Sequence, residues 1–221
     1  MSMLAASIAQ KNLPLLHLED SVSFSLQCME DFDVQHLVVV KDDYFLGIIG
    51  KSDLLDANES NALEVLSDQF LKIGITANAH FLIALDLFTK HQLSLLPVLN
   101  DQQECVGVIT NAQLNDSLAH FLGVAMQGAI LVLSISPFQY SLSEMSRIVE
   151  SNNAQIIQLN SYYDEINSNL VITIKLNKEE AGAIIATFQR YEYQILHYFG
   201  ITPLSNDIEN HYHHLMNYLD V

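Results

Sequence analysis

The chain has 221 residues, of which 50% are apolar, and it carries 9 lysines and arginines against 26 acidic residues, giving a formal net charge of −17. The apolar half is enough to form packed cores and excludes a chain that is disordered throughout. Binding to DNA, RNA or an anionic membrane requires clustered basic side chains, whereas the few basic residues here are scattered. We therefore do not expect nucleic acid or a membrane surface as partners.

The small number of cysteines and the lack of a signal-peptide pattern predict a cytoplasmic protein. Cys28 and Cys105 are too few for a disulfide framework, and we expect both thiols to be reduced. The first residues lack the basic and apolar regions of a signal peptide. Residues 121–140 carry no charge over about the length of a spanning helix. Glutamines, glycines, serines and a proline interrupt them, which favours a linker followed by a buried strand.

An internal repeat organises the first half of the chain, because residues 20–40 are matched by residues 78–98. Each block opens with a polar residue suited to a helix N-cap, continues with a helical apolar pattern and ends in an extended apolar run. A polar turn follows, then a second apolar strand that contains Gly47 or Gly107, then a short helix that begins near Ser52 or Ala112. Each unit is thus predicted to be a helix, a hairpin and a helix with a short extended lead-in.

This repeated pattern, with Gly-Ile-Ile in one copy and Pro97-Val98 and Gly-Val-Ile-Thr in the other, resembles a tandem pair of CBS domains over about residues 13–120. The resemblance implies one disc-like module that often dimerises. It also implies that AMP, ADP, ATP or S-adenosylmethionine binds in a cleft between the repeats. No cofactor is required by this reading.

The family's ligand motif has a glycine, two apolar residues, a hydroxyl residue and, three positions later, an aspartate that would hold the ribose hydroxyls. The first repeat keeps the aspartate as Asp53, but Gly50 replaces the hydroxyl residue, and Lys51 or Ser52 could substitute for it. By resemblance, these four residues form the better candidate site. The alternative is that Asp53 only stabilises the start of a helix through the helix dipole.

The second repeat keeps the other part of the motif. Thr110 supplies the hydroxyl, followed by Asn111, while Gln113 replaces the aspartate and can hydrogen-bond a ribose without charge assistance. With Lys51 as the one basic residue at hand, the acidic chain favours AMP or an adenosine moiety over ATP, unless a divalent cation accompanies ATP.

The second half is predicted to contain strands and helices in the order βαββαβ, a ferredoxin-like split unit. Ser141 and Glu144 have capping-box spacing, and Asn177 is expected to cap the second helix. A βαββαβ unit behind a CBS pair resembles an ACT-type regulatory domain, as in acetoin-utilisation-type regulatory proteins. The resemblance implies an amino-acid effector at the turn after the first strand, here Phe138, Gln139, Tyr140 and Ser141, although the motif's glycine is missing. The alternative is a packing or dimerising role.

The predicted fold class is α+β, with domain limits that follow from these patterns. They are an N-terminal segment 1–12, a CBS pair 13–122 with repeats 13–60 and 72–122, a linker 123–128, an ACT-like domain 129–200 and a C-terminal tail or helix 201–221.

No set of residues in this sequence has the spacing of a catalytic motif, so we expect a protein that is not an enzyme. His211 and His214 would share a helix face suited to a metal, but an amphipathic closing helix explains them equally, and no metal is expected. The leading hypothesis is a homodimeric regulatory protein that senses an adenosyl ligand and acts on a protein partner in trans. The alternative hypothesis is a homodimeric scaffold whose degenerate sites bind no nucleotide.

Overall fold

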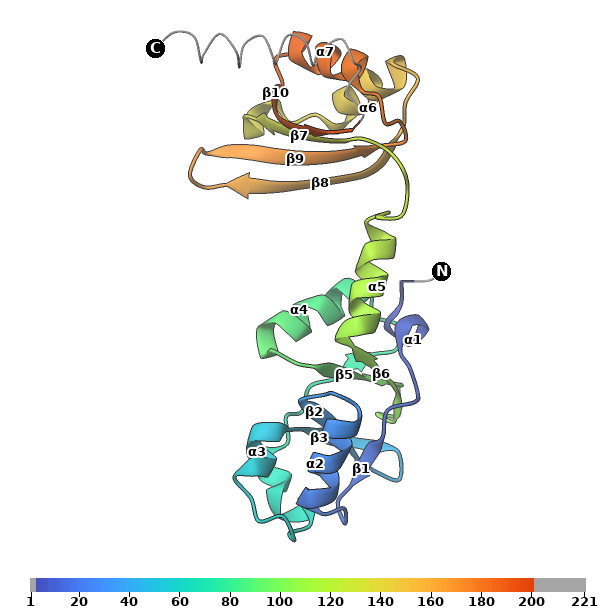
Figure 1. Ribbon diagram of the computed structural model, residues 1–221, viewed down its shortest axis with the longest axis vertical. Coiled ribbons are helices and arrows are strands. Elements are labelled where there is room, and N and C mark those ends of the chain that lie inside the picture. The colour runs from blue at the N-terminus through green and yellow to red at the C-terminus, as the bar shows by residue number, and fades with distance from the viewer. Residues whose placement is uncertain (1–2, 201–221) are drawn as a thin grey trace, which may run out of the picture. The chain divides into compact units, whose positions relative to one another are not determined.

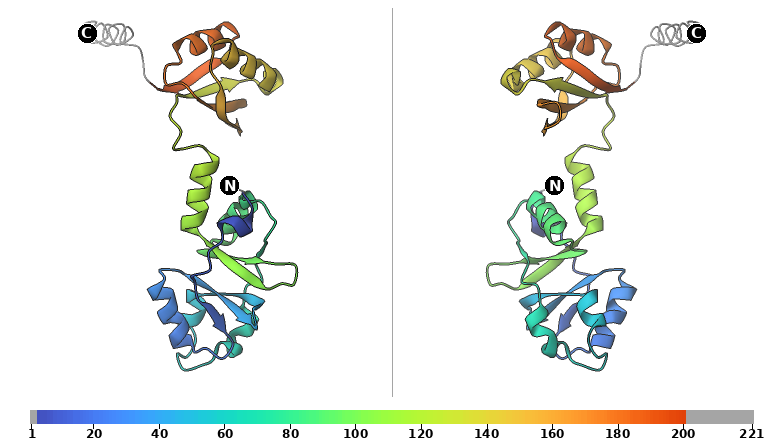
Figure 2. Two further views of the ribbon diagram at one scale, coloured as in Figure 1. Left: turned by 90° about the vertical axis from the view of Figure 1, so that its right-hand side faces the viewer. Right: turned by 90° about the vertical axis from the view of Figure 1, so that its left-hand side faces the viewer.

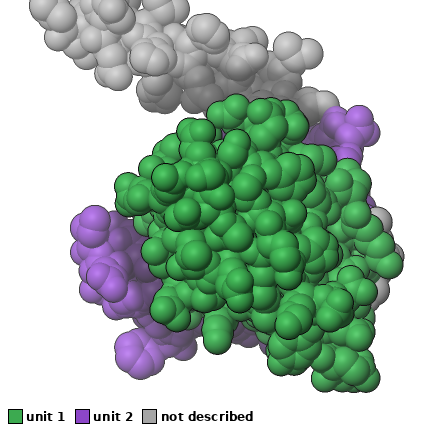
Figure 3. All heavy atoms as spheres, turned by 90° about the horizontal axis from the view of Figure 1, so that it is seen from below, with its two compact units in different colours: residues 1–119 green, residues 120–221 purple. Residues whose placement is uncertain are grey.

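The computed structural model describes residues 3–200. The chain divides between Ala119 and His120 into two compact units (Figure 3). Each unit has its own apolar core, and the two cores share no residue. None of the helices among the described residues is long and apolar enough to cross a membrane.

The first unit repeats one arrangement twice (Figures 1 and 2). In each copy a short parallel strand joins an antiparallel hairpin, giving the three-stranded sheets β1-β2-β3 and β4-β5-β6. Its elements are α1 Ala5–Ile8, β1 Leu15–His17, α2 Val22–Asp31, β2 His36–Lys41, β3 Tyr44–Gly50, α3 Lys51–Leu55, a 3-10 helix Leu63–Gln69, β4 Ile75–Thr76, α4 Phe81–His91, β5 Leu95–Leu99, β6 Cys105–Thr110 and α5 Asn111–Phe121.

The helix that opens each repeat starts one or two residues later than the sequence pattern suggests. Ser21 caps α2 by accepting a hydrogen bond from the Phe24 N–H at 3.1 Å, and His80 is the N-cap of α4. The carboxylate of Asp20 instead accepts from the His17 N–H at 2.7 Å. The polar residue that begins each block therefore belongs to the preceding turn.

Each repeat sends its lead-in segment across to the hairpin of the other repeat. Leu71, ahead of β4, pairs with Ile48 of β3, and Gln10, ahead of β1, pairs with Val108 of β6; each backbone hydrogen bond is 2.9 Å long. The described part of the predicted N-terminal segment 1–12, residues 3–12, thus contributes to this unit. The helix α1 packs its fully buried Ala5 into the core.

The second unit has the element order β7 Ile130–Ile135, a 3-10 helix Pro137–Gln139, α6 Leu142–Ser151, β8 Ile156–Asp164, β9 Asn169–Leu176, α7 Gly182–Arg190 and β10 Gln194–Phe199. The strands form one antiparallel sheet in the order β10-β7-β9-β8. Both helices cover the same face of this sheet, and their apolar side chains form the core with alternate residues of β7 and β9 (Figure 1). Among the described residues of this unit, no helix packs on the opposite face of the sheet.

Two local predictions for this unit have different outcomes. Ser141 caps α6 by accepting from the Glu144 N–H at 3.3 Å, as predicted. The prediction that Asn177 caps the next helix is wrong, because α7 begins at Gly182 with Ala181 as its N-cap. The Asn177 side chain instead accepts from the Gln155 N–H at 2.8 Å, which ties the end of β9 to the residue preceding β8.

Both cysteines are free in the structure. Cys28 is buried and Cys105 is partly buried. Burial raises the pKa of each thiol, which keeps both protonated and poorly reactive at neutral pH.

Candidate functional site

The first candidate half-site lies where β3 ends and α3 begins. Gly50 is the last residue of β3, and its N–H donates to Oδ2 of Asp53 at 3.2 Å. A Cβ atom on Gly50 would lie 3.1 Å from this same oxygen, closer than nearly all real Cβ contacts. The glycine that replaces the expected hydroxyl residue therefore makes room for the carboxylate of Asp53.

Lys51 and Ser52 complete this half-site without supplying a strong phosphate site. The ammonium of Lys51 lies 3.9 Å from the carboxylate of Glu30, so an acidic neighbour already shares its charge. Ser52 is exposed, and α3 has five residues, which is too short to provide a substantial helix dipole. The half-site is thus better suited to the hydroxyl groups of a sugar than to several phosphates.

His36 is a member of this site that its isolated position in the sequence did not reveal. It begins β2 and lies opposite Gly50 in the strand register. Its Nδ1 accepts from the Ser94 N–H at 3.2 Å, which joins the first repeat to the second. Burial lowers the pKa of His36, while the nearby Asp53 carboxylate acts in the opposite direction. A largely neutral imidazole therefore stands beside the carboxylate.

The second candidate half-site is closed by its own hydrogen bonds. Oε1 of Gln113 accepts from the Thr110 N–H at 3.1 Å and also from the Thr110 hydroxyl. Nε2 of Gln113 donates to Oε1 of Gln10 at 2.9 Å. Asn111 is the exposed first residue of α5. Gln10 was not predicted from the sequence, because it lies in the segment ahead of the first repeat.

The contact between His36 and Ser94 also connects the two half-sites. Gly50 lies opposite His36 on β2, and Thr110 lies opposite Leu95, the residue after Ser94. The strand ends that carry the two half-sites are therefore joined through β2 and β5. Ligands at the two half-sites would therefore act on the same junction, the contact between His36 and Ser94.

Two cavities of about 330 Å³ each lie at the hairpin turns, at the opposite ends of β3 and β6 from the predicted half-sites. One is lined by residues that include Lys11, Cys105 and Gly107, and the other by residues that include Lys72 and Tyr44. The two cavities are related by the repeat. None of the predicted ligand residues lines either of them.

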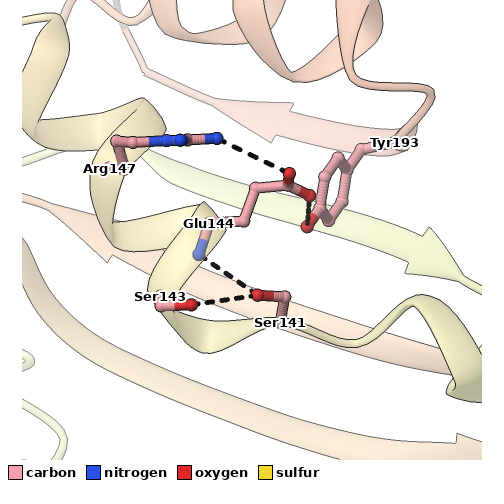
Figure 4. A network of polar contacts seen from close by, with 5 residues as sticks. All are labelled: Ser141, Ser143, Glu144, Arg147 and Tyr193. Carbon is pink, nitrogen blue, oxygen red and sulfur yellow. Dashed lines mark hydrogen bonds and ion pairs between the residues drawn. The ribbon is translucent and has the colours of Figure 1, made fainter.

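The predicted effector turn in the second unit is held by polar contacts at its helix end (Figure 4). The Ser141 hydroxyl caps α6 and lies 3.1 Å from the Ser143 hydroxyl. The carboxylate of Glu144 does not reach back to Ser141 in a reciprocal capping box. It accepts from the Tyr193 hydroxyl at 2.9 Å and lies 3.8 Å from Arg147. Burial and the bond to Glu144 raise the pKa of Tyr193, which keeps its hydroxyl a donor.

The remaining effector candidates do not converge on a common point. The side chain of Phe138 is 99% exposed and Tyr140 is 39% exposed. Gln139 is the last residue of a 3-10 helix, and its backbone N–H donates to the Ser136 carbonyl. Of the four predicted residues, Ser141 has a defined structural role, as a helix cap.

The predicted metal candidates His211 and His214 lie outside the described residues. Within residues 3–200, no group of three or more histidine, cysteine, aspartate or glutamate side chains could hold a metal ion.

Comparison with known proteins identifies the first unit. Residues 5–60 and 73–120 match the family model of the CBS domain. Over 159 residues the chain is 27% identical to an inosine-5'-monophosphate dehydrogenase of Halobacterium salinarum, covering 68% of this chain and 30% of that enzyme. The chain thus spans less than a third of the length of this curated relative.

Solved structures give the same result for the fold. A CBS domain pair/ACT domain protein of Thermotoga maritima matches with a TM-score of 0.50 and 20% identity, covering 54% of this chain and 99% of the other. The protein CBSX2, solved in complex with AMP, matches with a TM-score of 0.46 and 15% identity over 54% of this chain and 98% of its own. The two matches to the family model make the first unit a tandem pair of CBS domains, and the element order gives the chain a mixed α+β fold.

Proposed function

We propose that this protein is a non-enzymatic regulatory protein whose CBS pair binds an adenosyl ligand at the half-site of Gly50, Lys51, Ser52 and Asp53. Asp53 would accept hydrogen bonds from the two ribose hydroxyls. The ligand would be AMP or S-adenosylmethionine rather than ATP, because Lys51 already faces Glu30 and α3 is short. Binding would favour one relative arrangement of the two repeats and so signal to a partner in trans.

The observation that carries this proposal is the free acceptor capacity of Asp53. Within residues 3–200, the one hydrogen bond that its carboxylate accepts comes from the Gly50 N–H. An ionised carboxylate has two oxygens and about four acceptor positions. A partly buried carboxylate with unused acceptors beside a neutral imidazole suits a pair of neutral hydroxyl donors.

The second unit has a role in this proposal as an ACT-like, ferredoxin-like domain that dimerises the chain. Its support is the βαββαβ element order and the antiparallel strand order β10-β7-β9-β8. An effector at the turn of Phe138 to Ser141 has less support, because the Ser141 hydroxyl already caps α6. Dimerisation would be measured by light scattering on the full chain.

The test of the proposed ligand is calorimetric titration of the full chain with AMP, ADP, ATP and S-adenosylmethionine, supported by melting curves. We expect saturable binding and a higher Tm with at least one of them. Asp53→Asn should weaken that binding by about tenfold or more, because it removes a charge-assisted pair of hydrogen bonds. Asp56→Asn is the matched control, since Asp56 is an exposed acidic residue at the C-cap of the same helix.

A particular pattern of results would replace this proposal by the scaffold alternative. That pattern is a stable dimer that shows no binding of any of the four compounds at millimolar concentration. Equal loss of binding in Asp53→Asn and Asp56→Asn would instead remove Asp53 from the site.

A further inference from the structure

The face of the second unit's sheet that lies opposite α6 and α7 carries a cavity of about 350 Å³. Its floor is built by residues that lie opposite one another on three strands. Gln158 of β8, Lys175 of β9 and Ile130 of β7 form one row across the sheet, and Asn160 and Thr173 form the next. Their side chains alternate with the core residues of the same strands and therefore point away from α6 and α7.

The segment that precedes β7 closes one side of this cavity. Leu122 and Val124 line it, with Gly123 between them. Gly123 has a φ of +60°, a conformation that favours glycine, and a Cβ atom there would lie 3.3 Å from the Ile157 side chain. The chain can therefore lie this close to the sheet because residue 123 has no side chain.

Lys175 is the charged group at the base of the cavity, and its residue surface is 8% exposed. Its ammonium donates to the carbonyl oxygens of Gly123 at 2.5 Å and Val124 at 3.2 Å. An ammonium group has three donors, so one remains for a ligand in the cavity. Burying a lysine is costly without a partner that compensates its charge, and two neutral carbonyls compensate it only in part.

The charge of the cavity is opposite to that of the chain. None of the residues that line it is acidic, although the chain carries a net charge of −17. Leu122, Val124 and Ile130 supply apolar walls, while the amides of Gln158 and Asn160 and the Thr173 hydroxyl supply neutral donors. Small-molecule sites typically combine such apolar walls with a few polar groups that orient the ligand.

From this cavity we infer a binding site for a small monocarboxylate with a short aliphatic body, whose carboxylate pairs with Lys175. A phosphate would place about two negative charges against one ammonium within apolar walls. An α-amino acid would bring an ammonium group for which the lining offers no carboxylate. The site is independent of the adenosyl half-site, because its residues belong to the second unit.

The test is calorimetric titration of the full chain with isovalerate, with isoamyl alcohol and isoamylamine as uncharged and cationic counterparts of the same shape. We expect saturable binding of one isovalerate per chain and no binding of the other two. Lys175→Met should weaken isovalerate binding by about tenfold or more, the usual effect of losing a hydrogen bond to a charged group. Lys178→Met should change it less than twofold, since Lys178 is exposed and donates to the Asn152 carbonyl.

A second variant keeps the inference testable if Lys175→Met does not fold. Val124 is 63% exposed, so Val124→Phe should fill the cavity from its rim while leaving the Tm unchanged. We expect it to weaken isovalerate binding by at least tenfold. Absence of saturable binding by the wild-type chain at millimolar isovalerate, or unchanged binding by Val124→Phe, overturns the inference.

Discussion

The two CBS repeats contain the same strand, turn and helix, but the residue at the ligand position behaves differently in each. In the first repeat Asp53 accepts from the backbone of Gly50 and retains free acceptor positions. In the second repeat Gln113 accepts from Thr110 and donates to Gln10. A side-chain amide can do both, whereas an ionised carboxylate can only accept. Gln113 thus makes an internal contact at the position where Asp53 keeps acceptors for the proposed ligand.

The repeats also differ in how closely the crossing segments pack on them. A Cβ atom on Gly47 of β3 would lie 2.6 Å from the Cβ of Phe70, whereas a Cβ atom on Gly107 of β6 would lie 3.0 Å from the Cβ of Ala9. The first repeat therefore holds its crossing segment more tightly. Gly47 also has a φ of +156°, which residues with a side chain rarely adopt, so packing and backbone conformation both favour glycine at this position.

The largest effect that would test this comparison is the stability change caused by Gly47→Ala. We expect it to destabilise the first unit by about 2–3 kcal/mol, because the new methyl group meets a Cβ atom that cannot move independently of the backbone and because the φ of +156° at Gly47 disfavours a side chain. Gly107→Ala should cost about 1 kcal/mol. Urea unfolding followed by circular dichroism measures both free energies, and equal costs would contradict the difference between the two glycine positions.

The next largest effect is a change in the number of AMP molecules bound per chain after the substitution Gln113→Asp. The shorter, ionised side chain should release Gln10 and accept from ribose hydroxyls as Asp53 is proposed to do. We expect the calorimetric stoichiometry for AMP to rise from one to two per chain, with the two affinities within about tenfold of each other. A stoichiometry that stays at one would show that the residue at position 113 does not decide the difference.

A smaller effect is expected from Gln10→Ala, which removes the amide that occupies the second half-site. Loss of this hydrogen bond should lower the free energy of unfolding by about 1 kcal/mol. AMP binding at Asp53 should be unchanged. Gln139→Ala in the second unit serves as a control. A similar loss of unfolding free energy in that variant would contradict a specific contribution of the hydrogen bond between Gln10 and Gln113.

The smallest expected effect concerns the pH dependence of the junction between the repeats. Burial holds the pKa of His36 below its ordinary value of 6.5, so the unfolded chain takes up the proton first as the pH falls. The stability that His36 contributes is therefore complete above about pH 6.5 and is lost progressively below it. In His36→Asn the amide oxygen can still accept from the Ser94 N–H without titrating.

The measurement is the urea midpoint of the wild-type chain and of His36→Asn between pH 7.5 and 5.5. The midpoint of the variant should fall less on acidification than that of the wild type. His91→Asn is the control, because His91 is exposed at the end of α4. Parallel pH profiles for the wild type and His36→Asn would place the acid sensitivity elsewhere.

Much of the fold could be predicted from the sequence because it follows from local patterns. The repeat of residues 20–40 and 78–98 identified the CBS pair, and the capping role of Ser141 followed from its spacing to Glu144. The prediction for Asn177 failed because its side chain bonds to Gln155 rather than to the next helix. A capping residue and a residue that bridges two strands have the same signature in a single sequence.

What the sequence by itself determined is the chemistry available at each position, including a carboxylate at 53, an amide at 113 and a lone lysine on β9. Only the tertiary structure decided which of these groups remain available to a ligand. Gln10 reaches Gln113, His36 reaches Ser94 and the segment at Gly123 reaches Lys175 across long stretches of chain. Hydrophobic periodicity records which face of an element is buried, but it carries no information about which distant side chain meets that element. The net charge of −17 predicts that nucleic acid and anionic membranes are not partners, and the folded chain places a local exception to this acidic character at Lys175.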